Sequence, residues 1–139
     1  MIRRFTKMVG ALMPIGVVLL IACSAAVAQH GGKAEPNRIE FKRGATSTTV
    51  SGVVHGDEEA EYALSAKKGQ RLVIKLTSAP VKSSCFDLKG PDQADVGLEY
   101  DCNWDYSKPL PATGDYFISV ARPTESKGTS RYRLIVTVR

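Results

Sequence analysis

Apolar and polar residues alternate from Ile39 to Leu76, in the run IEFKRGATSTTVSGVVHGDEEAEYALSAKKGQRLVIKL, and glycines interrupt the run where strands must turn. Alternation of this kind is typical of half-buried β-strands, whereas an amphipathic helix repeats its apolar residues every three to four positions. A second run, LPATGDYFISV from Leu110 to Val120, leads from a Pro/Gly turn into another alternating segment. Both regions therefore predict strands rather than helices.

Short strand patterns recur at regular spacing along the chain. They fall at residues 38–41, 48–54, 61–66, 71–77, 85–89, 97–101, 115–121 and 131–138. In the segment 71–77, Leu72, Ile74 and Leu76 are expected to face the core, because successive side chains of a strand point to opposite faces. Eight short strands predict an all-β fold, an eight-stranded antiparallel β-sandwich of jelly-roll-like type.

The first residues of the chain have the features of an export signal. Arg3, Arg4 and Lys7 precede an uncharged apolar run at residues 9–22, and the sequence AVA at 26–28 fits a cleavage site. We therefore expect a signal peptide at 1–28, a flexible leader at 29–37 and one β-sandwich domain at 38–139, in a protein exported to the periplasm or secreted. The sequence LIAC at 20–23 also suits a lipobox, so the alternative is a lipoprotein anchored in the membrane through a lipidated Cys23.

Charge and cysteines narrow the function classes further. Cleavage after Ala28 removes three basic residues and no acidic one, which lowers the formal net charge from +5 to +2. A weak, mixed charge of this kind excludes a nucleic-acid-binding surface.

Export to an oxidising compartment predicts a disulfide between Cys85 and Cys102, with two spare thiols as the alternative.

Motifs for catalysis and metal binding are missing from the sequence. The two histidines are His30, in the expected leader, and His55, in an expected turn, and no G-x-S-x-G motif accompanies them. No His/Cys cluster has the spacing of a zinc site. Acidic residues gather at 57–61 and again at 92–105 and could suit calcium, although no EF-hand spacing is present. The sequence predicts a protein that is not an enzyme and has no cofactor and no metal, with calcium left open.

Two other features point to binding. Trp104 lies next to Cys102 and is expected to pack in the core over the disulfide, with a binding platform as the alternative. The chain after Val120 is strongly basic, since Arg122, Lys127, Arg131, Arg133 and Arg139 accompany a single acidic residue, Glu125. Such a segment could enter an acidic cleft on a protein partner, where charge-assisted hydrogen bonds to carboxylates are strong.

A further set of strand and turn residues covers most of the expected domain: Phe41, Gly44, Ser51, Gly52, Gly56, Tyr62, Ala66, Lys67, Lys68, Gly69, Gln70, Leu110, Pro111, Gly114, Tyr116 and Val120. In these residues the chain resembles the periplasmic inhibitors of goose-type (g-type) lysozyme, whose sandwich is similar to the bacterial pre-peptidase C-terminal domain.

The resemblance implies a non-catalytic envelope protein that blocks the cleft of a g-type lysozyme, its protein partner. The candidate contact residues are Tyr62, Arg122, Lys127 and Arg131. Because a fold does not determine a function, two alternatives stay open. One is an envelope module that binds glycan or protein without inhibiting lysozyme, and the other is a structural envelope protein. The sequence makes no prediction of the oligomeric state.

Overall fold

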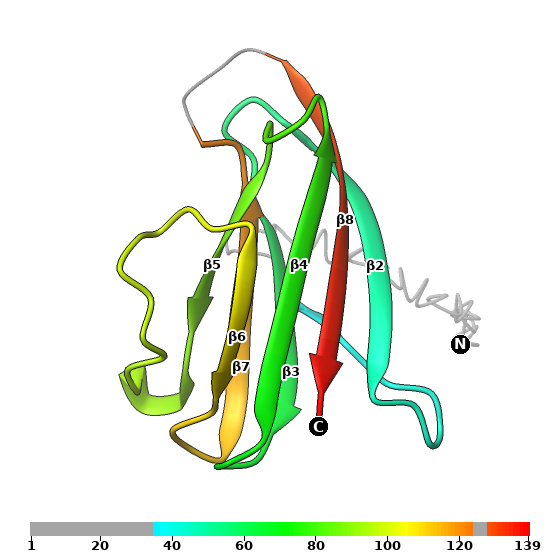
Figure 1. Cartoon of the computed structure of the whole chain (residues 1–139). Coiled ribbons are helices and arrows are strands. Elements are labelled where there is room, and N and C mark those ends of the chain that lie inside the picture. Colours follow the sequence, from blue (N-terminus) through cyan, green and yellow to red (C-terminus); the bar gives the residue numbers. More distant parts are fainter. Residues whose placement is uncertain (1–34, 124–127) are drawn as a thin grey trace, which may run out of the picture. The chain divides into compact units, whose positions relative to one another are not determined.

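The computed structural model describes residues 35–123 and 128–139, which form two four-stranded β-sheets packed face to face (Figure 1). Sheet A has the strand order β1-β3-β7-β5, and sheet B the order β2-β8-β4-β6. The strands are β1 (Asn37–Arg38), β2 (Ser47–His55), β3 (Ala60–Ala66), β4 (Arg71–Ala79), β5 (Cys85–Lys89), β6 (Asp105–Pro109), β7 (Gly114–Ala121) and β8 (Thr129–Val138). A single 3-10 turn, η1 (Pro91–Gln93), follows β5.

The predicted eight-stranded β-sandwich is confirmed. Neighbouring strands pair in antiparallel fashion except the two-residue β1, which runs parallel to β3. No helix in the described part of the chain has the length and apolar character needed to span a membrane. The expected signal peptide with Cys23, and most of the expected leader, lie outside the described residues.

One strand prediction is wrong. Residues 97–101 belong to the connection between β5 and β6, and the sixth strand begins only at Asp105. Gly97 has a φ of +74° and its N–H donates to the Asp95 carboxylate at 2.7 Å, so the chain turns where an extended segment was expected. The pattern of β6 is hard to recognise because Tyr106 is its one buried residue.

The core lies between the two sheets and follows the alternation of the sequence. The predicted inward residues of β4 are buried, as are alternate residues of its neighbour β8. The fully buried large side chains are Tyr116, Phe86, Leu64, Leu72, Ile74, Ile118, Leu134, Val54, Val120 and Val136. Removing apolar area from water in this way supplies the main driving force for folding.

Two tyrosines join the sheets inside this core. The hydroxyl oxygens of Tyr62, on β3, and Tyr132, on β8, lie 2.5 Å apart, and both side chains are buried. Burial, with the hydrogen bond to Tyr62 second, raises the pKa of Tyr132, so this hydroxyl stays neutral. Gly52 pairs with Tyr132 across β2 and β8, and a Cβ at this position would overlap the Tyr132 hydroxyl. Glycine therefore makes room for the ring.

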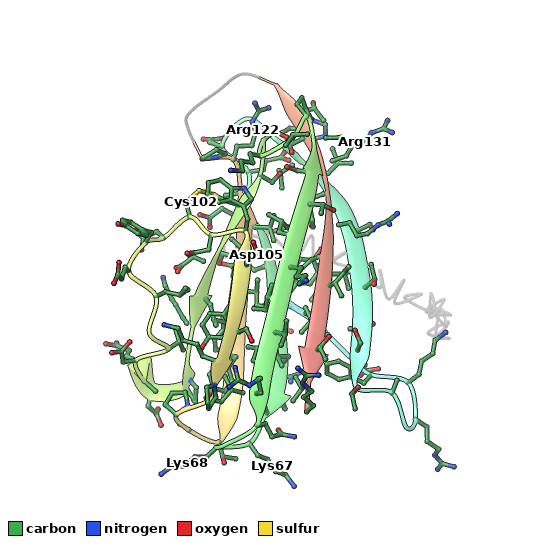
Figure 2. All side chains as sticks on the ribbon, viewed as in Figure 1. Lys67, Lys68, Cys102, Asp105, Arg122 and Arg131 are labelled. Atoms are coloured by element: carbon green, nitrogen blue, oxygen red, sulfur yellow. A yellow bond between two sulfur atoms is a disulfide. The ribbon has the colours of Figure 1, made fainter. Side chains whose placement is uncertain are left out.

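The two turns predicted from the sequence meet at one end of the sandwich. Gly69, with a φ of +88°, donates its N–H to the Leu110 carbonyl at 2.9 Å, and Leu110 donates to the Gln70 carbonyl at 2.8 Å. The Tyr116 hydroxyl donates to the Ala112 carbonyl at 2.6 Å, which closes the second turn on itself. Figure 2 marks this end by Lys67 and Lys68. Many residues that carry the sequence resemblance are thus structural residues of this turn end.

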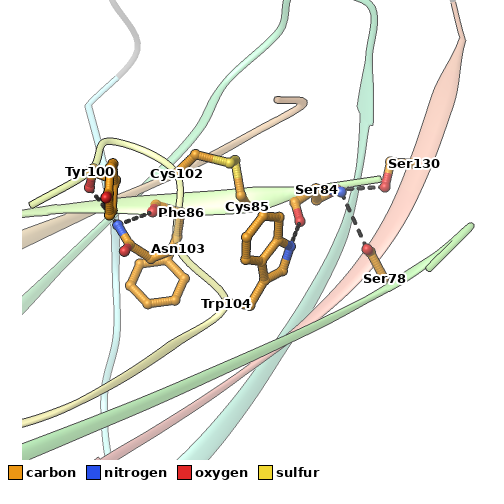
Figure 3. Close-up of a disulfide and its surroundings, with 9 residues drawn as sticks. All are labelled: Ser78, Ser84, Cys85, Phe86, Tyr100, Cys102, Asn103, Trp104 and Ser130. Atoms are coloured by element: carbon orange, nitrogen blue, oxygen red, sulfur yellow. Dashed lines mark hydrogen bonds between the residues drawn. A yellow bond between two sulfur atoms is a disulfide. The ribbon is translucent and has the colours of Figure 1, made fainter. Parts of the chain in front are cut away.

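The disulfide between Cys85 and Cys102 is confirmed, with a Cα–Cα distance of 5.1 Å (Figure 3). It joins the first residue of β5 to the end of the long loop before β6. Trp104 packs against the core beside it, as expected, and the indole Nε1 donates to the Ser84 carbonyl at 2.8 Å. The disulfide and the indole together fasten the loop to sheet A.

Candidate functional site

The opposite end of the sandwich, which we call the loop end, brings together the β2–β3, β4–β5 and β7–β8 connections (Figure 1). Gly56 donates its N–H to the Gly128 carbonyl at 2.8 Å, and His55 Nδ1 lies 2.8 Å from Thr129 Oγ1. The β4–β5 connection is held through Ser83, whose hydroxyl lies 2.6 Å from that of Ser130. Hydrogen bonds between loops fix their shape before any partner arrives.

Arg122 is the most unusual side chain at the loop end. It follows β7 directly and is half-buried, and its Nε and Nη1 atoms are enclosed without a hydrogen-bond partner in the described structure. Gly128 allows this position, because a Cβ there would lie 2.8 Å from Arg122 Nη1. An enclosed donor without an acceptor costs roughly 1–3 kcal/mol, and more for a charged group. Such a cost is typical of a site that gains its acceptors on binding.

A groove of about 470 Å³ opens beside Arg122, next to the disulfide. Its lining includes four carboxylate residues, Glu59, Glu61, Asp87 and Asp101. Glu59, Glu61 and Asp101 come from the two acidic regions seen in the sequence, whereas Asp87 lies on β5. The four residues meet because β3 and β5 both flank β7 in sheet A. Sequence analysis found both acidic groups but could not show that they face each other. Within the described ranges, no three His, Cys, Asp or Glu side chains are arranged to hold a metal ion.

The predicted contact residues occupy different places. Arg131 lies on β8, paired with Val53 and Ala79, and its exposed side chain projects from the outer face of sheet B near the loop end (Figure 2). Tyr62 is only 7% exposed and belongs to the core. Lys127 lies outside the described residues.

Arg131 is part of a second, shallower surface. Together with Arg133, Ser51 and Thr77 it lines a hollow of about 570 Å³ on the outer face of sheet B. Arg133 pairs with Ser51 on one side and Thr77 on the other, so the two arginines project from the same face of β8. The structure therefore brings Arg122 and Arg131 to the same end of the molecule but on different sheets.

Comparison with known proteins agrees with this architecture. The chain is 27% identical over 128 residues to the inhibitor of g-type lysozyme of Escherichia coli K12, a match that covers 88% of this chain and 93% of that protein. The crystal structure of Aeromonas hydrophila PliG, a periplasmic lysozyme inhibitor of g-type lysozyme, has a TM-score of 0.65 at 25% identity and covers 75% of this chain and 96% of that chain. No family model matches the chain.

A more distant likeness concerns the fold alone. The pre-peptidase C-terminal domain of a collagenase from Bacillus anthracis has a TM-score of 0.52 at 18% identity and covers 76% of this chain and 95% of that chain. The resemblance to g-type lysozyme inhibitors, and the likeness of their sandwich to the pre-peptidase domain, are therefore both confirmed.

Proposed function

We propose that this protein is a non-catalytic inhibitor of g-type lysozyme that works in the periplasm and contacts the enzyme through its loop end. The observation that carries the proposal is the match to the Escherichia coli inhibitor, which extends over nearly the whole length of both chains. A match of this extent includes the loops as well as the shared sandwich.

Inhibition of this kind needs binding but no reaction. Arg122 has a charge that is partly removed from water and two enclosed donors without acceptors. A carboxylate on the enzyme could accept two parallel hydrogen bonds from the guanidinium. This bidentate pair is a strong hydrogen-bonding arrangement for arginine. The acidic lining of the groove would at the same time repel other anions, so the proposed contact selects a partner whose carboxylate reaches Arg122 itself.

The first experiment measures residual cell-wall lysis. The protein is purified from the envelope of expressing cells in its oxidised form and titrated against a goose-type and a chicken-type lysozyme. Stoichiometric loss of goose-type activity is expected, because a preorganised protein surface binds with a defined ratio. Binding to glycan or to another protein, with no loss of lysis in either titration, would reject inhibition and favour the envelope-module alternative.

Substitutions then test the contact residues. We expect Arg122→Ala to weaken inhibition at least tenfold, since losing one charged hydrogen-bonding partner at an interface costs about 2–5 kcal/mol. Arg131→Ala, at an exposed arginine, is expected to have a smaller effect, and Lys127→Ala tests the remaining candidate. Arg43→Ala, an exposed arginine in the turn before β2, is the matched control and should inhibit normally. Equal inhibition by the Arg122 variant and the control would rule out Arg122 as a contact.

The N-terminus determines how the inhibitor is held in the envelope. Cleavage after Ala28 is proposed to release a soluble periplasmic domain, whereas modification of Cys23 would anchor the same domain to a membrane. The intact mass of the purified protein distinguishes an N-terminus at Gln29 from a lipidated one at Cys23.

A further inference from the structure

The connection between β5 and β6, in which residues 97–101 were predicted to be a strand, is a long loop that runs from Gly90 to Trp104 and bows outward beside the sheets (yellow-green in Figure 1). Long loops with almost no regular structure are usually either functional or disordered. This loop is held in place by hydrogen bonds and by the disulfide. The Tyr106 hydroxyl donates to the Val96 carbonyl at 2.8 Å, the Asn103 side chain donates to the Tyr100 carbonyl at 2.6 Å, and the disulfide closes the far end (Figure 3).

This fixed loop presents apolar surface to water. Tyr100 is 70% exposed, and Phe117, on the outer face of β7, is 40% exposed. Both side chains line one groove of about 710 Å³ between the loop and sheet A, with Leu98 and Val96 in the same wall. Among the described residues the exposed large apolar side chains are Val53, Val81, Tyr100 and Phe117, so half of them lie in this groove. Apolar patches kept open in this way commonly mark an interaction site.

The charge around the groove indicates what it would accept. Four aspartates, Asp87, Asp92, Asp95 and Asp101, share its lining with one cation, Lys89. Lys89 Nζ lies 4.0 Å from Asp87 Oδ2, so this cation is balanced within the groove and the remaining charge is negative. Carboxylates at the rim attract a cation by charge, and the faces of Tyr100 and Phe117 can attract one through their ring quadrupoles.

The edge of β5 limits how a partner could bind. Phe86 exchanges both backbone hydrogen bonds with Asn103, so its polar groups point away from β7. The groups of Leu88, two residues further along, point the same way, and its N–H already donates to Asp87 Oδ1 at 2.8 Å. A partner strand would have to displace this bond. Recognition through side chains in the groove is therefore favoured over strand addition.

We propose that this groove binds an arginine- or lysine-bearing peptide segment of a protein partner, with the cation among the aspartates and its aliphatic stem against Tyr100 and Phe117. The proposal goes beyond lysozyme inhibition, and its test does not depend on lysozyme. The groove adjoins the one beside Arg122, and Asp87, Lys89 and Asp101 line both, but Tyr100 and Phe117 line this groove and not the other. A neutral sugar could also stack on the two rings and donate its hydroxyls to the carboxylates. It would not neutralise their negative charge, which is why we favour the cationic segment.

The test uses the oxidised protein and a fluorescein-labelled peptide, glycine-arginine-leucine-arginine-glycine, followed by fluorescence anisotropy. We expect saturable binding. Its affinity should fall as salt rises from 50 to 300 mM, because dissolved ions screen the attraction between exposed charges. Tyr100→Ala should weaken binding about threefold, in line with an exposed cation–π contact. Asp92→Asn combined with Asp101→Asn should weaken it about tenfold. Val81→Ala, which removes an exposed apolar side chain outside the groove, should change nothing.

Several outcomes would overturn the proposal. These are no binding of the arginine peptide, equal binding of a peptide in which glutamate replaces arginine, and tighter binding of an N-acetylglucosamine oligosaccharide. Unchanged binding by both the Tyr100 and the aspartate variants would also reject it. Circular dichroism confirms that each variant is folded, and amide chemical-shift changes confined to the loop from Gly90 to Trp104 and to β7 would place the peptide in the groove.

Discussion

The hydroxyl pair of Tyr62 and Tyr132 shows how a single contact can fix the relation between the two sheets. Hydrophobic packing alone tolerates some sliding of one sheet over the other, whereas a hydrogen bond at 2.5 Å between buried groups requires one alignment. Gly52 is part of the same arrangement, because any larger residue would push the Tyr132 ring out of place. Both tyrosines lie in segments that the sequence predicted to be strands, but only the structure pairs them.

A double-mutant cycle tests this contact. Tyr132→Phe leaves the buried Tyr62 hydroxyl without its partner and should lower the free energy of unfolding by about 1–3 kcal/mol. Tyr62→Phe should have a similar effect, and the double variant should be less destabilised than the sum of the two single variants, because no orphan hydroxyl remains. Urea denaturation of all four proteins provides the measurement. Strict additivity would show that the two hydroxyls do not stabilise each other.

Among the elements, β1 is attached by an ion pair in addition to its pairing with β3. It contributes only two residues to sheet A, yet Arg38 Nη2 lies 2.8 Å from Asp115 Oδ2, and Ser65 donates to the same carboxylate at 2.7 Å. Arg38 first, and then Ser65, lower the pKa of Asp115 to about 2. The ion pair spans β1 and β7, with β3 between them, and holds the start of the domain against the sheet.

The pH dependence of this attachment follows from the lowered pKa. Asp115 binds a proton more readily in the unfolded chain, where its pKa is near 4, than in the folded protein. Its contribution is therefore fully present above about pH 4 and is lost as the pH falls through about 2. Asp115→Asn should be less stable than the wild type at pH 7, and the difference should shrink over this acidic range. A difference that stayed constant from pH 7 to 2 would argue against the ion pair.

Elements also show where sequence analysis succeeded and failed. Strands β4 and β8 are central in sheet B and have one buried face, so their alternation predicted both their place and their inward residues. The segment at 97–101 alternates too, but it connects a strand of sheet A to one of sheet B and must leave both sheets to do so. Edge strand β6 buries only Tyr106 and gives almost no periodic signal. Sequence periodicity reports burial, and it is therefore weakest at edges and crossings.

The candidate site was predictable only in part, for a related physical reason. A run of basic residues after Val120 is visible in the sequence, and Arg122 was found in this way. Its enclosed donors, the facing carboxylates of Glu59 and Asp101, and the exposure of Tyr100 depend on contacts between distant segments. No local pattern encodes such contacts, because loops follow no fixed repeat.

For the molecule as a whole, the two ends of the sandwich differ in structure. The turn end closes the core through hydrogen bonds between Gly69, Gln70 and Leu110, and the loop end carries Arg122. The rigid sheets between them allow the loops to vary without loss of the fold. The disulfide lies on the side of the proposed contact, since Cys85 and Cys102 line the groove beside Arg122. It should therefore affect both stability and binding.

This double role leads to a prediction for the protein without its disulfide. Replacing Cys85 and Cys102 by serine frees a loop with a sequence separation of 17 residues, and the chain-entropy account gives a loss of about 3 kcal/mol in the free energy of unfolding. The sheets are expected to remain intact, because the packed cluster between them is formed by other side chains. Inhibition of g-type lysozyme should weaken several-fold, even under conditions where circular dichroism reports a fully folded domain. Without the disulfide the groove wall is more flexible, so it loses more conformational entropy on binding. Inhibition that is as strong as that of the oxidised protein would mean that the disulfide serves stability alone.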